Sequence, residues 1–533
     1  MTRRVPLFIT LTLSLTACGD DAPDDTLMEA APESLLQEVG KDPDVCDGEC
    51  DVFETTLDPS FVVTDPKILE RFELRRVLDQ LASFSGSSTG ADEIWKQWWS
   101  SQRIRSGGDP AHHPFCDDNG SQINGFDITC PRQESLLEFE PIESHAPVAL
   151  FNRFDLAPMD GAHCGEYRIV YALGADKRAQ EIQTESEFDE VRNGRNFLIF
   201  EGVLPNPDPD CGLAACLPVA EFWQGLSTES DVGVQADLLE QFYFDGICDL
   251  KPVVTPEHYG FQCRDGGGYG GECGQIRTNQ FIEREWNLRE FTLEEGCGER
   301  GCELIVQQTT VAQNPHVSLW DSTHPDHGSF SSDLVNQMSL QMPVPDGVNH
   351  ISAGTDGKFD AGESVATFGG FNFNLYDADS TFEATIAGAL LGSPSTITEF
   401  DIEDRMTTQS CGGCHELSNS VSLGNSQGGT SVVWPNSGGF VHVDENSNLS
   451  PALLNEFLPF RQLVMTKFLD ATCGVECFGE KADLDIIKVV EESDAKTGEE
   501  LVFFELTTFA DAEKAKAERE GLPPDTLSGA RVH

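Results

Sequence analysis

The residues most suited to chemistry lie together near the end of the chain, in the run Cys411-Gly412-Gly413-Cys414-His415. Two thiols three positions apart can each bond to a vinyl group of one haem, and the histidine that follows can bind its iron as the proximal ligand. A zinc site would need two more ligands, and the sequence has no second Cys-x-x-Cys or His-x3-His run. A redox disulfide would be expected in a thioredoxin-like βαβ setting, which is also missing from the sequence. Covalent haem is therefore our interpretation, and a small structural disulfide is the alternative.

The first residues indicate export from the cytoplasm. Arg3 and Arg4 precede a short apolar stretch over 5–15, which is too short to span a bilayer as a mature helix. The run Leu15-Thr16-Ala17-Cys18-Gly19 resembles the lipobox of bacterial lipoproteins. The resemblance implies that residues 1–17 are a signal peptide and that Cys18 carries the lipid. Because Gly19 rather than Asp follows Cys18, the outer membrane is favoured. The alternative is an ordinary secretion signal with an incidental cysteine.

The charge of the chain limits its partners. There are 34 Lys and Arg against 91 Asp and Glu, a formal net charge of −57. Such a field repels nucleic acid and anionic lipid surfaces, so neither is an expected partner. Contact with a membrane is expected through the N-terminal lipid alone. The acidity either attracts cations and basic proteins or reflects adaptation to a salty habitat.

Cysteine usage fits an oxidising compartment. The chain has 17 cysteines, and assigning one to lipid and two to haem leaves an even number for disulfides. Close spacing predicts five local bridges, namely Cys46/Cys50, Cys211/Cys216, Cys263/Cys273, Cys297/Cys302 and Cys473/Cys477. Cys116/Cys130 and Cys164/Cys248 complete the set, although sequence alone cannot fix the connectivity.

The fold class expected from the sequence is α+β. Residues 18–60 are expected to form an acidic, disordered tether, and residues 61–395 a large, mixed, strand-rich body stapled by disulfides. Residues 396–480 are expected to form a small helical module, and residues 481–533 are a C-terminal extension. Short apolar runs predict strands at 147–156, 166–173, 196–204, 302–312 and 364–376. Helices are expected at 64–82 and 234–244, and the tryptophans at 95, 98 and 99 are interpreted as core. Parts of the body resemble uncharacterised large bacterial envelope lipoproteins ("VALFNRFDLAP…HCGEYRIVYAL", "GQIRTNQFI…WNLREF").

The module at 396–480 carries the cysteine motif. A helix over 396–417 ends in the motif, and a second helix begins near Ser450, which suits the cap position, with Pro451 in its first turn. This order resembles c-type cytochromes, and the resemblance covers some 80 residues. It implies one covalent haem c on Cys411 and Cys414, with His415 as the proximal iron ligand.

The second iron ligand is expected in the segment before the closing helix. His442 lies there and no methionine does, so His442 is our first candidate, and Met465 inside the closing helix is the runner-up. A five-coordinate iron is the alternative, in which His442 is only a packed or solvent-facing residue. The choice matters because Met/His ligation raises the reduction potential, whereas an open position admits peroxide or other small ligands.

A weaker signal is a partial calcium loop in "TDGKFDAGE". Asp356, Asp360 and Glu363 match its later positions, whereas Ser352 and Gly354 occupy the two earliest ligand positions. The alternative is a plain polar turn.

Three functions follow from these patterns. The first is a lipid-anchored envelope haem protein that passes single electrons to a partner protein that the sequence does not identify. The second is a haem-dependent, peroxidase-like oxidoreductase. The third is a non-redox surface-binding or structural lipoprotein in which Cys411 and Cys414 form one more disulfide.

Overall fold

The structure is a computed structural model, and it describes residues 55–86, 89–100, 122–127, 142–158, 160–174, 195–248, 250–261, 273–282, 285–298, 301–338, 347–351, 354–367, 376–391, 396–426 and 429–472. All of them belong to one compact unit, Val45–His533. The fold is of the α+β class, as expected. The predicted signal peptide at 1–17, the predicted lipidation site Cys18, residues 19–54 of the predicted tether and the extension at 481–533 lie outside the described residues. The last residues of the predicted tether, 55–60, belong to the described fold and include the helix Leu57–Ser60.

An eight-stranded antiparallel sheet forms the centre of the described structure. Its order is β1-β4-β5-β6-β7-β8-β10, with β9 paired to the far half of the long strand β8. The strands are β1 Val62–Val63, β4 His145–Arg153, β5 His163–Leu173, β6 Asn196–Pro205, β7 Gln275–Ile282, β8 Glu285–Gly298, β9 Gly301–Thr309 and β10 Ser364–Thr367. The predicted strands at 147–156, 166–173, 196–204 and 302–312 are thereby confirmed, and the run at 364–376 is a strand over its first four residues.

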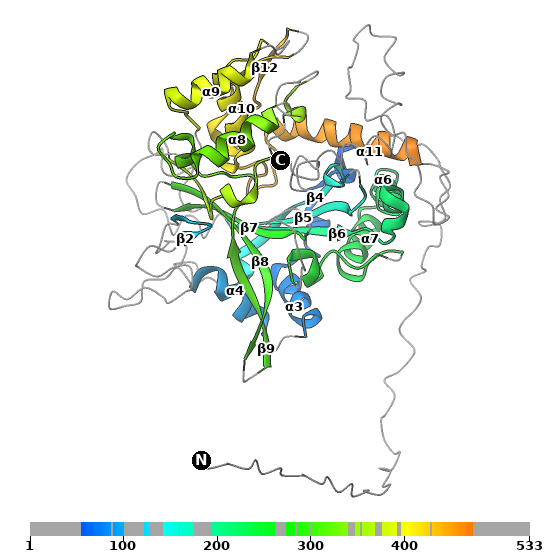
Figure 1. Cartoon of the computed structure of the whole chain (residues 1–533). Coiled ribbons are helices and arrows are strands. Elements are labelled where there is room, and N and C mark those ends of the chain that lie inside the picture. Colours follow the sequence, from blue (N-terminus) through cyan, green and yellow to red (C-terminus); the bar gives the residue numbers. More distant parts are fainter. Residues whose placement is uncertain are drawn as a thin grey trace, which may run out of the picture. The chain divides into compact units, whose positions relative to one another are not determined.

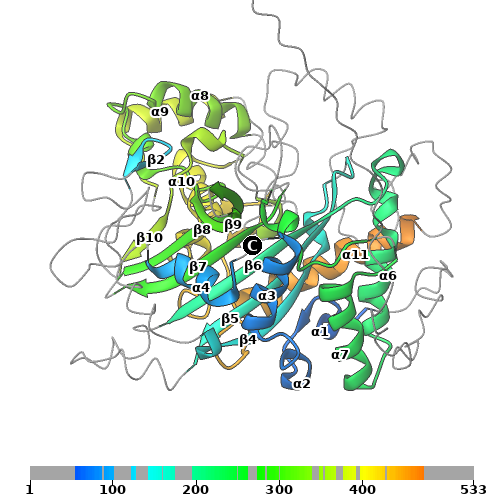
Figure 2. The same ribbon diagram turned by 90° about the horizontal axis from the view of Figure 1, so that it is seen from below.

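Helices cover both faces of this sheet (Figure 1). Seen from below, α3 and α4 lie across one face, with α6 and α7 beside them, whereas α10 and α11 lie on the other (Figure 2). Their bounds are α1 Leu57–Ser60, α2 Pro66–Leu69, α3 Leu74–Phe84, α4 Ala91–Ser100, α6 Leu217–Leu226, α7 Val232–Glu240, α8 His327–Gln337, α9 Ser380–Leu390, α10 Glu399–Gln409 and α11 Leu458–Thr472. The single helix predicted over 64–82 is two helices, α2 and α3, and the Asp65 side chain caps the first by accepting from Lys67 N–H. The helix predicted over 234–244 is α7 continued by a π-turn, η6 Gln241–Asp245.

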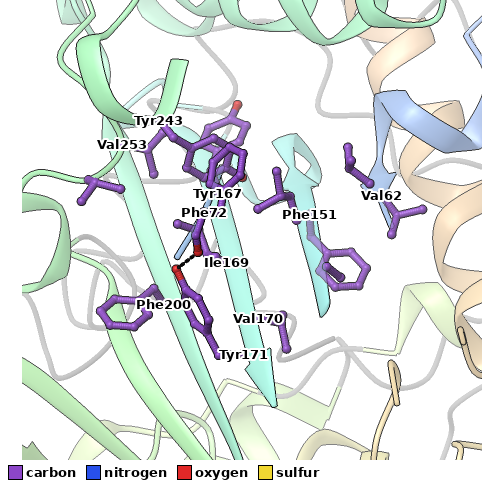
Figure 3. Packing of buried hydrophobic residues seen from close by; sticks show 14 of the residues in the cluster. Val62, Phe72, Phe151, Tyr167, Ile169, Val170, Tyr171, Phe200, Tyr243 and Val253 are labelled. Carbon is purple, nitrogen blue, oxygen red and sulfur yellow. Dashed lines mark hydrogen bonds between the residues drawn. The ribbon is translucent and has the colours of Figure 1, made fainter. Parts of the chain in front are cut away.

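The face under α3 and α4 is the aromatic core. Side chains that alternate along β5 and β6, such as Ile169, Tyr171 and Phe200, pack there (Figure 3). The Tyr171 hydroxyl donates to Phe72 O at 2.9 Å, so the ring is buried with its polar atom satisfied. Trp98 belongs to the same cluster and meets Phe200 edge-on, which confirms its predicted place in the core.

The opposite face carries charged residues in register across the strands. Phe151 of β4 is paired with Arg168 of β5, and Arg168 is paired with Glu201 of β6. One row further along, Arg277 of β7 faces Glu290 of β8. Because side chains alternate along a strand, the same strands present an aromatic face to α3 and α4 and an ionic face to α11.

The C-terminal segment packs on the ionic face. It contains α10, the π-turn η12 Gly413–Leu417, a hairpin of β11 Ser422–Asn425 and β12 Ser431–Val433, the π-turn η13 Leu453–Phe457 and finally α11. The two expected helices are present, and Ser450 caps the second by accepting from Leu453 N–H at 3.2 Å. The stretch between them, expected as a loop, includes the hairpin.

One disulfide differs from the predicted pairing. Cys164 of β5 is bonded to Cys216 at the start of α6, with a Cα–Cα distance of 5.2 Å that is ordinary for a disulfide. The predicted bridges Cys211/Cys216 and Cys164/Cys248 are therefore wrong, although Cys211 and Cys248 are both disulfide-bonded. The sheet topology brings together residues 52 positions apart, which sequence spacing cannot show.

Candidate functional site

The cysteine motif follows directly from the end of α10. This helix begins with a capping box in which Thr398 and Asp401 bond reciprocally to each other's backbone N–H. It ends at Ser410, whose hydroxyl accepts from Gly413 N–H at 3.0 Å and whose carbonyl accepts from Cys414 N–H at 2.9 Å. The motif is thus wound tightly against the last turn of the helix.

The two glycines of the motif meet different surroundings. A Cβ atom on Gly413 would lie 1.6 Å from the carbonyl oxygen of Thr407, a distance that no side chain can occupy. On Gly412 the nearest atoms would be 3.5 Å away, an ordinary contact. Gly412 instead uses its backbone, because its N–H donates to the Ser364 hydroxyl of β10 at 3.0 Å. The motif is therefore fixed to the edge of the sheet.

Both thiols of the motif are free and buried. The other cysteine side chains that the structure describes are in disulfides, namely Cys164, Cys211, Cys216, Cys248, Cys273 and Cys302. Burial raises the pKa of Cys411 to about 12 and that of Cys414 well above its usual range, so both groups are thiols rather than thiolates at neutral pH. The pair does not form the disulfide loop that was the alternative to haem.

His415 is held in one orientation by a backbone carbonyl. Its Nδ1 lies 2.9 Å from the oxygen of Phe440, so Nδ1 carries the proton and Nε2 is the ring atom with a lone pair. Burial, opposed by this hydrogen bond, lowers the pKa of His415 to about 4, and the imidazole is neutral at physiological pH. A metal-binding histidine commonly donates its second nitrogen in this way.

The Phe440 carbonyl is itself fixed from several directions. Phe440 adopts a positive φ of 64°, which is unusual for a bulky residue. Its N–H donates to Glu416 at 3.3 Å, and its carbonyl also accepts from Asn279 of β7 at 3.1 Å. The Trp286 ring of β8 stacks on Phe440 and lies 5.4 Å from the His415 ring. These contacts explain why the carbonyl can hold an imidazole in place.

His442 lies beside His415, with their ring centroids 4.8 Å apart. Its Nδ1 is 3.0 Å from the Ser450 hydroxyl, and its Nε2 is 3.2 Å from the sulfur of Cys414. The runner-up Met465 is buried elsewhere, where its sulfur accepts from Asn152 at 3.6 Å. Of the two proposed second ligands, the structure brings only His442 to His415.

A cavity opens where the two histidines meet the ionic face of the sheet. Its floor comes from alternate residues of β4 to β8, namely Phe151, Arg153, Arg168, Val170, Phe197, Ile199, Glu201, Arg277, Asn279 and Leu288. Its other wall consists of His415, Val441, His442, Val443, Leu453, Phe457 and Arg461. The lining is mainly apolar with several arginines.

Two of these arginines are matched by carboxylates. Arg277 donates from Nε to Glu290 at 2.7 Å and from Nη1 to Glu201 at 3.2 Å. Arg168 lies 3.2 Å from Glu201 and is also bonded to Glu166. All of these groups are buried or nearly so, and such a network is stable only when each charge has a partner.

The calcium candidates are occupied by other interactions. Asp356 caps the short 3-10 helix η11 Gly357–Phe359 and pairs with Lys358, whereas Glu363 pairs with the buried Arg289. Asp360 accepts from the backbone N–H groups of Gln313 and Asn314. The three carboxylates therefore face different partners, and the structure gives no support to a calcium site.

Within the described ranges, no group of three or more His, Cys, Asp or Glu side chains is arranged to hold a metal ion. The zinc alternative for the motif thus finds no further ligands there. In the same part of the chain, no helix combines the length and apolarity needed to cross a bilayer.

Comparison with known proteins gives no relative. No protein family, curated protein or solved structure matches this chain. The site is therefore interpreted from its own residues.

The sequence predicted Cys411, Cys414, His415 and His442 as site residues. It did not predict the residues that hold them in place or the arginines on the opposite wall of the cavity. Glu416 directly follows the motif, and a carboxylate beside a proposed metal ligand was a usable signal. Arg153, Arg168 and Arg277 lie 138 to 262 positions before His415 in the chain. The order of the strands in the sheet brings these arginines under the motif, so no local sequence pattern could predict them.

Proposed function

We propose that this protein is a c-type haem protein of the cell envelope that transfers single electrons. The observation that carries the proposal is the pair of free, buried thiols beside a neutral, oriented imidazole at the rim of a cavity. In a chain whose other described cysteines are bridged, a pair kept as thiols needs another use. Segment 396–472 would act as the attachment module, comparable to that of c-type cytochromes, with the sheet as its floor.

The residues present fit a haem in three respects. His415 offers Nε2 while Nδ1 is bonded to a carbonyl, as iron and zinc ligands commonly do. The cavity has apolar walls for a flat ring, formed by residues such as Phe151, Phe197 and Leu288. It also has arginines that match carboxylate groups, among them Arg153 and Arg461. When bound, the haem would supply one reversible electron at its iron.

Attachment and iron binding would both require His442 to move. In the described structure its Nε2 is in contact with Cys414, and its ring centroid is 4.8 Å from that of His415. His415 would hold the iron, and His442 would join it as the second ligand only after leaving the Cys414 thiol.

The covalent step conserves electrons. Each S–H group adds across one vinyl C=C bond, so that sulfur bonds to one carbon and hydrogen goes to the other. One C–S bond and one C–H bond form, one S–H bond and the C=C π bond break, and nothing is oxidised. Cys411 and Cys414 would supply the two thiols.

A second candidate function depends on the position of His442. If His442 leaves Cys414 on haem attachment but does not reach the iron, the iron has an open position, and a peroxidase-like oxidoreductase follows. For either function, the lipobox-like run supports anchoring through Cys18, and the redox partner would be another protein at the envelope.

The decisive experiment is a haem-specific stain on a denaturing gel. Protein matured in cells with haem-attachment machinery should retain the stain through denaturation, and Cys414→Ala should abolish it. The same chain made in cells without that machinery is the matched control and should stay unstained. If the fully matured protein is colourless and its intact mass lacks one haem, the redox proposal is wrong and the disulfide-stapled structural lipoprotein is the better explanation.

A further inference from the structure

Two arginines at one end of the cavity differ from the rest. Arg153 of β4 and Arg461 of α11 are 1% and 4% exposed, and both line the cavity beside His442. They also line a smaller adjoining cavity, whose wall includes Asp155 and Phe457. The two guanidinium groups therefore stand at the junction of two internal spaces.

Their hydrogen bonding is incomplete. Arg153 donates from Nε and Nη2 to the two oxygens of Asp155, at 2.9 and 3.0 Å. Arg461 Nε is 3.8 Å from the same carboxylate. The Nη1 atoms of both arginines are buried and have no hydrogen-bond partner among the described residues. A buried cationic donor without an acceptor is costly, so a partner from outside the chain is expected.

The carboxylates around the cavity are shared unevenly among its arginines. Both Arg153 and Arg461 lie near Asp155, and Glu166 of β5 is paired with Arg153 across the strands. Burial, with the neighbouring Arg153, lowers the pKa of Arg461 well below its usual range. Arg168 and Arg277 differ, because each is paired with two glutamates. Among the arginines that line the cavity in the described structure, Arg153 and Arg461 are thus the two with unbonded buried donors.

We propose that Arg153 and Arg461 together bind one carboxylate group of the ligand in this cavity, and that this group is a propionate side chain of the haem. A carboxylate presents two oxygens to the two unbonded Nη1 donors. The inference rests on the proposed function, because the porphyrin supplies both the carboxylate and the apolar ring that the remaining lining fits. The pair would orient the ring and would take no part in the electron transfer.

The test distinguishes binding through the haem carboxylates from binding through the porphyrin ring. The full chain carrying Cys411→Ala and Cys414→Ala cannot form thioethers and is purified without haem. It is refolded from urea in the presence of increasing haemin or haemin dimethyl ester, whose carboxylates are blocked, and the Soret absorbance gives each dissociation constant. We expect haemin to bind tighter by roughly tenfold or more, the value of a charge-assisted hydrogen bond.

Variants of this chain then locate the effect. Arg153→Met/Arg461→Met should bind the two porphyrins about equally, whereas Arg71→Met, a change to an exposed arginine away from the cavity, should keep the preference. Arg461→Met alone leaves the Arg153–Asp155 pair intact and should lower the preference, which keeps the test decisive if the double variant does not fold.

Each remaining outcome overturns the inference in a different way. Equal binding of haemin and its ester by the parent chain would refute the carboxylate site while leaving the haem proposal standing. If, in addition, sodium propionate raises the melting temperature of the parent chain but not of Arg153→Met/Arg461→Met, the site takes a free carboxylate instead. Binding of neither porphyrin would refute the haem proposal and this inference together.

Discussion

His442 lies between the Cys414 thiol and the Ser450 hydroxyl, and in the proposed haem-bearing protein its position would decide whether the iron has a second ligand. If it becomes the second ligand, the wild-type protein is low-spin. His442→Ala should then give a high-spin, five-coordinate ferric spectrum while the covalent stain is retained. Met465→Leu is the matched control and should leave the spectrum unchanged, because Met465 is bonded to Asn152. A high-spin wild type would instead favour the peroxidase-like function.

Arg461 provides a second prediction, on the haem-free chain. Arg461→Met removes a buried cation that Arg153 repels. Its Nε lies 3.8 Å from Asp155, which is too far for a hydrogen bond. Replacing buried ionic groups by apolar side chains is often neutral or stabilising, by up to about 4 kcal/mol, and here the Arg153–Asp155 pair stays intact. Chemical denaturation of the haem-free protein should therefore show an increased free energy of unfolding. Arg277→Met, which breaks a matched network, should lower it, and a loss of stability in Arg461→Met would count against an unfilled anion site.

The individual side chains of the site differ in how far sequence could predict them. Cys411, Cys414 and His415 are contiguous, and their chemistry follows from residue type and spacing. The burial of the thiols and the Phe440 carbonyl at His415 depend on a loop with a positive φ, which no pattern in the sequence marks. The arginines of the cavity are separated from the motif by most of the body.

At the scale of elements, the turn after α10 depends on one glycine. Gly413→Ala would place a methyl group against the Thr407 carbonyl, so the backbone would have to shift. Overpacking of this kind typically costs about 1–3 kcal/mol. We expect a lower melting temperature and a weaker haem stain for Gly413→Ala. Gly412→Ala has ordinary contacts and should resemble wild type; equal effects of the two changes would contradict the observed winding of the motif.

Helix α10 also carries a titrating group, Glu403. Burial, with repulsion from Asp377 and Glu383, raises its pKa from 4.5 to about 7. Because the folded state binds this proton more tightly than the unfolded state, its contribution to stability is present below about pH 4.5 and is lost as the pH rises through about 7. Glu403→Gln, which mimics the neutral acid, should therefore gain stability over wild type as the pH increases from about 5 to 8. Urea unfolding across this range tests the prediction, and a constant difference would refute it.

The strands that could be predicted from the sequence are those with continuous runs of apolar residues. β4, β5, β6 and β9 contain runs of apolar residues that predict strands. β7 and β8 were not predicted, because arginine, asparagine and glutamate interrupt their apolar residues. Those polar side chains are buried opposite one another across the strands, as Arg277 and Glu290 are, so a pattern that resembles a surface segment belongs to the interior. Tertiary pairing, rather than local preference, determines these two strands.

For the whole molecule, the lipobox-like run predicts where the protein resides. Cys18→Ser should remove the lipid and move the protein from the membrane fraction to the soluble fraction of the envelope. The haem stain should be unchanged, since attachment at Cys411 and Cys414 does not involve the N-terminus. Fractionation followed by the stain measures both quantities, and membrane association that persists in the variant would refute a lipid anchor at Cys18.

The ionic face of the sheet also bears on how far the attachment segment can act alone. Five strands from residues 145 to 298 lie under the segment at 396–472, and both belong to the same compact unit. Expressed by itself, the segment would lose the floor of its cavity and the arginines in it. We therefore expect the isolated segment to lack the axial ligation and potential of the full chain, even where its thioethers form.

Because both thiols are sealed inside the finished structure, the sequence of events during biogenesis is constrained. A cofactor delivered after folding would meet neither sulfur, so the proposed haem would have to be installed while the polypeptide is still open. The strands would then close around a prosthetic group already in place, and the yield of mature protein would depend on whether attachment is faster than folding.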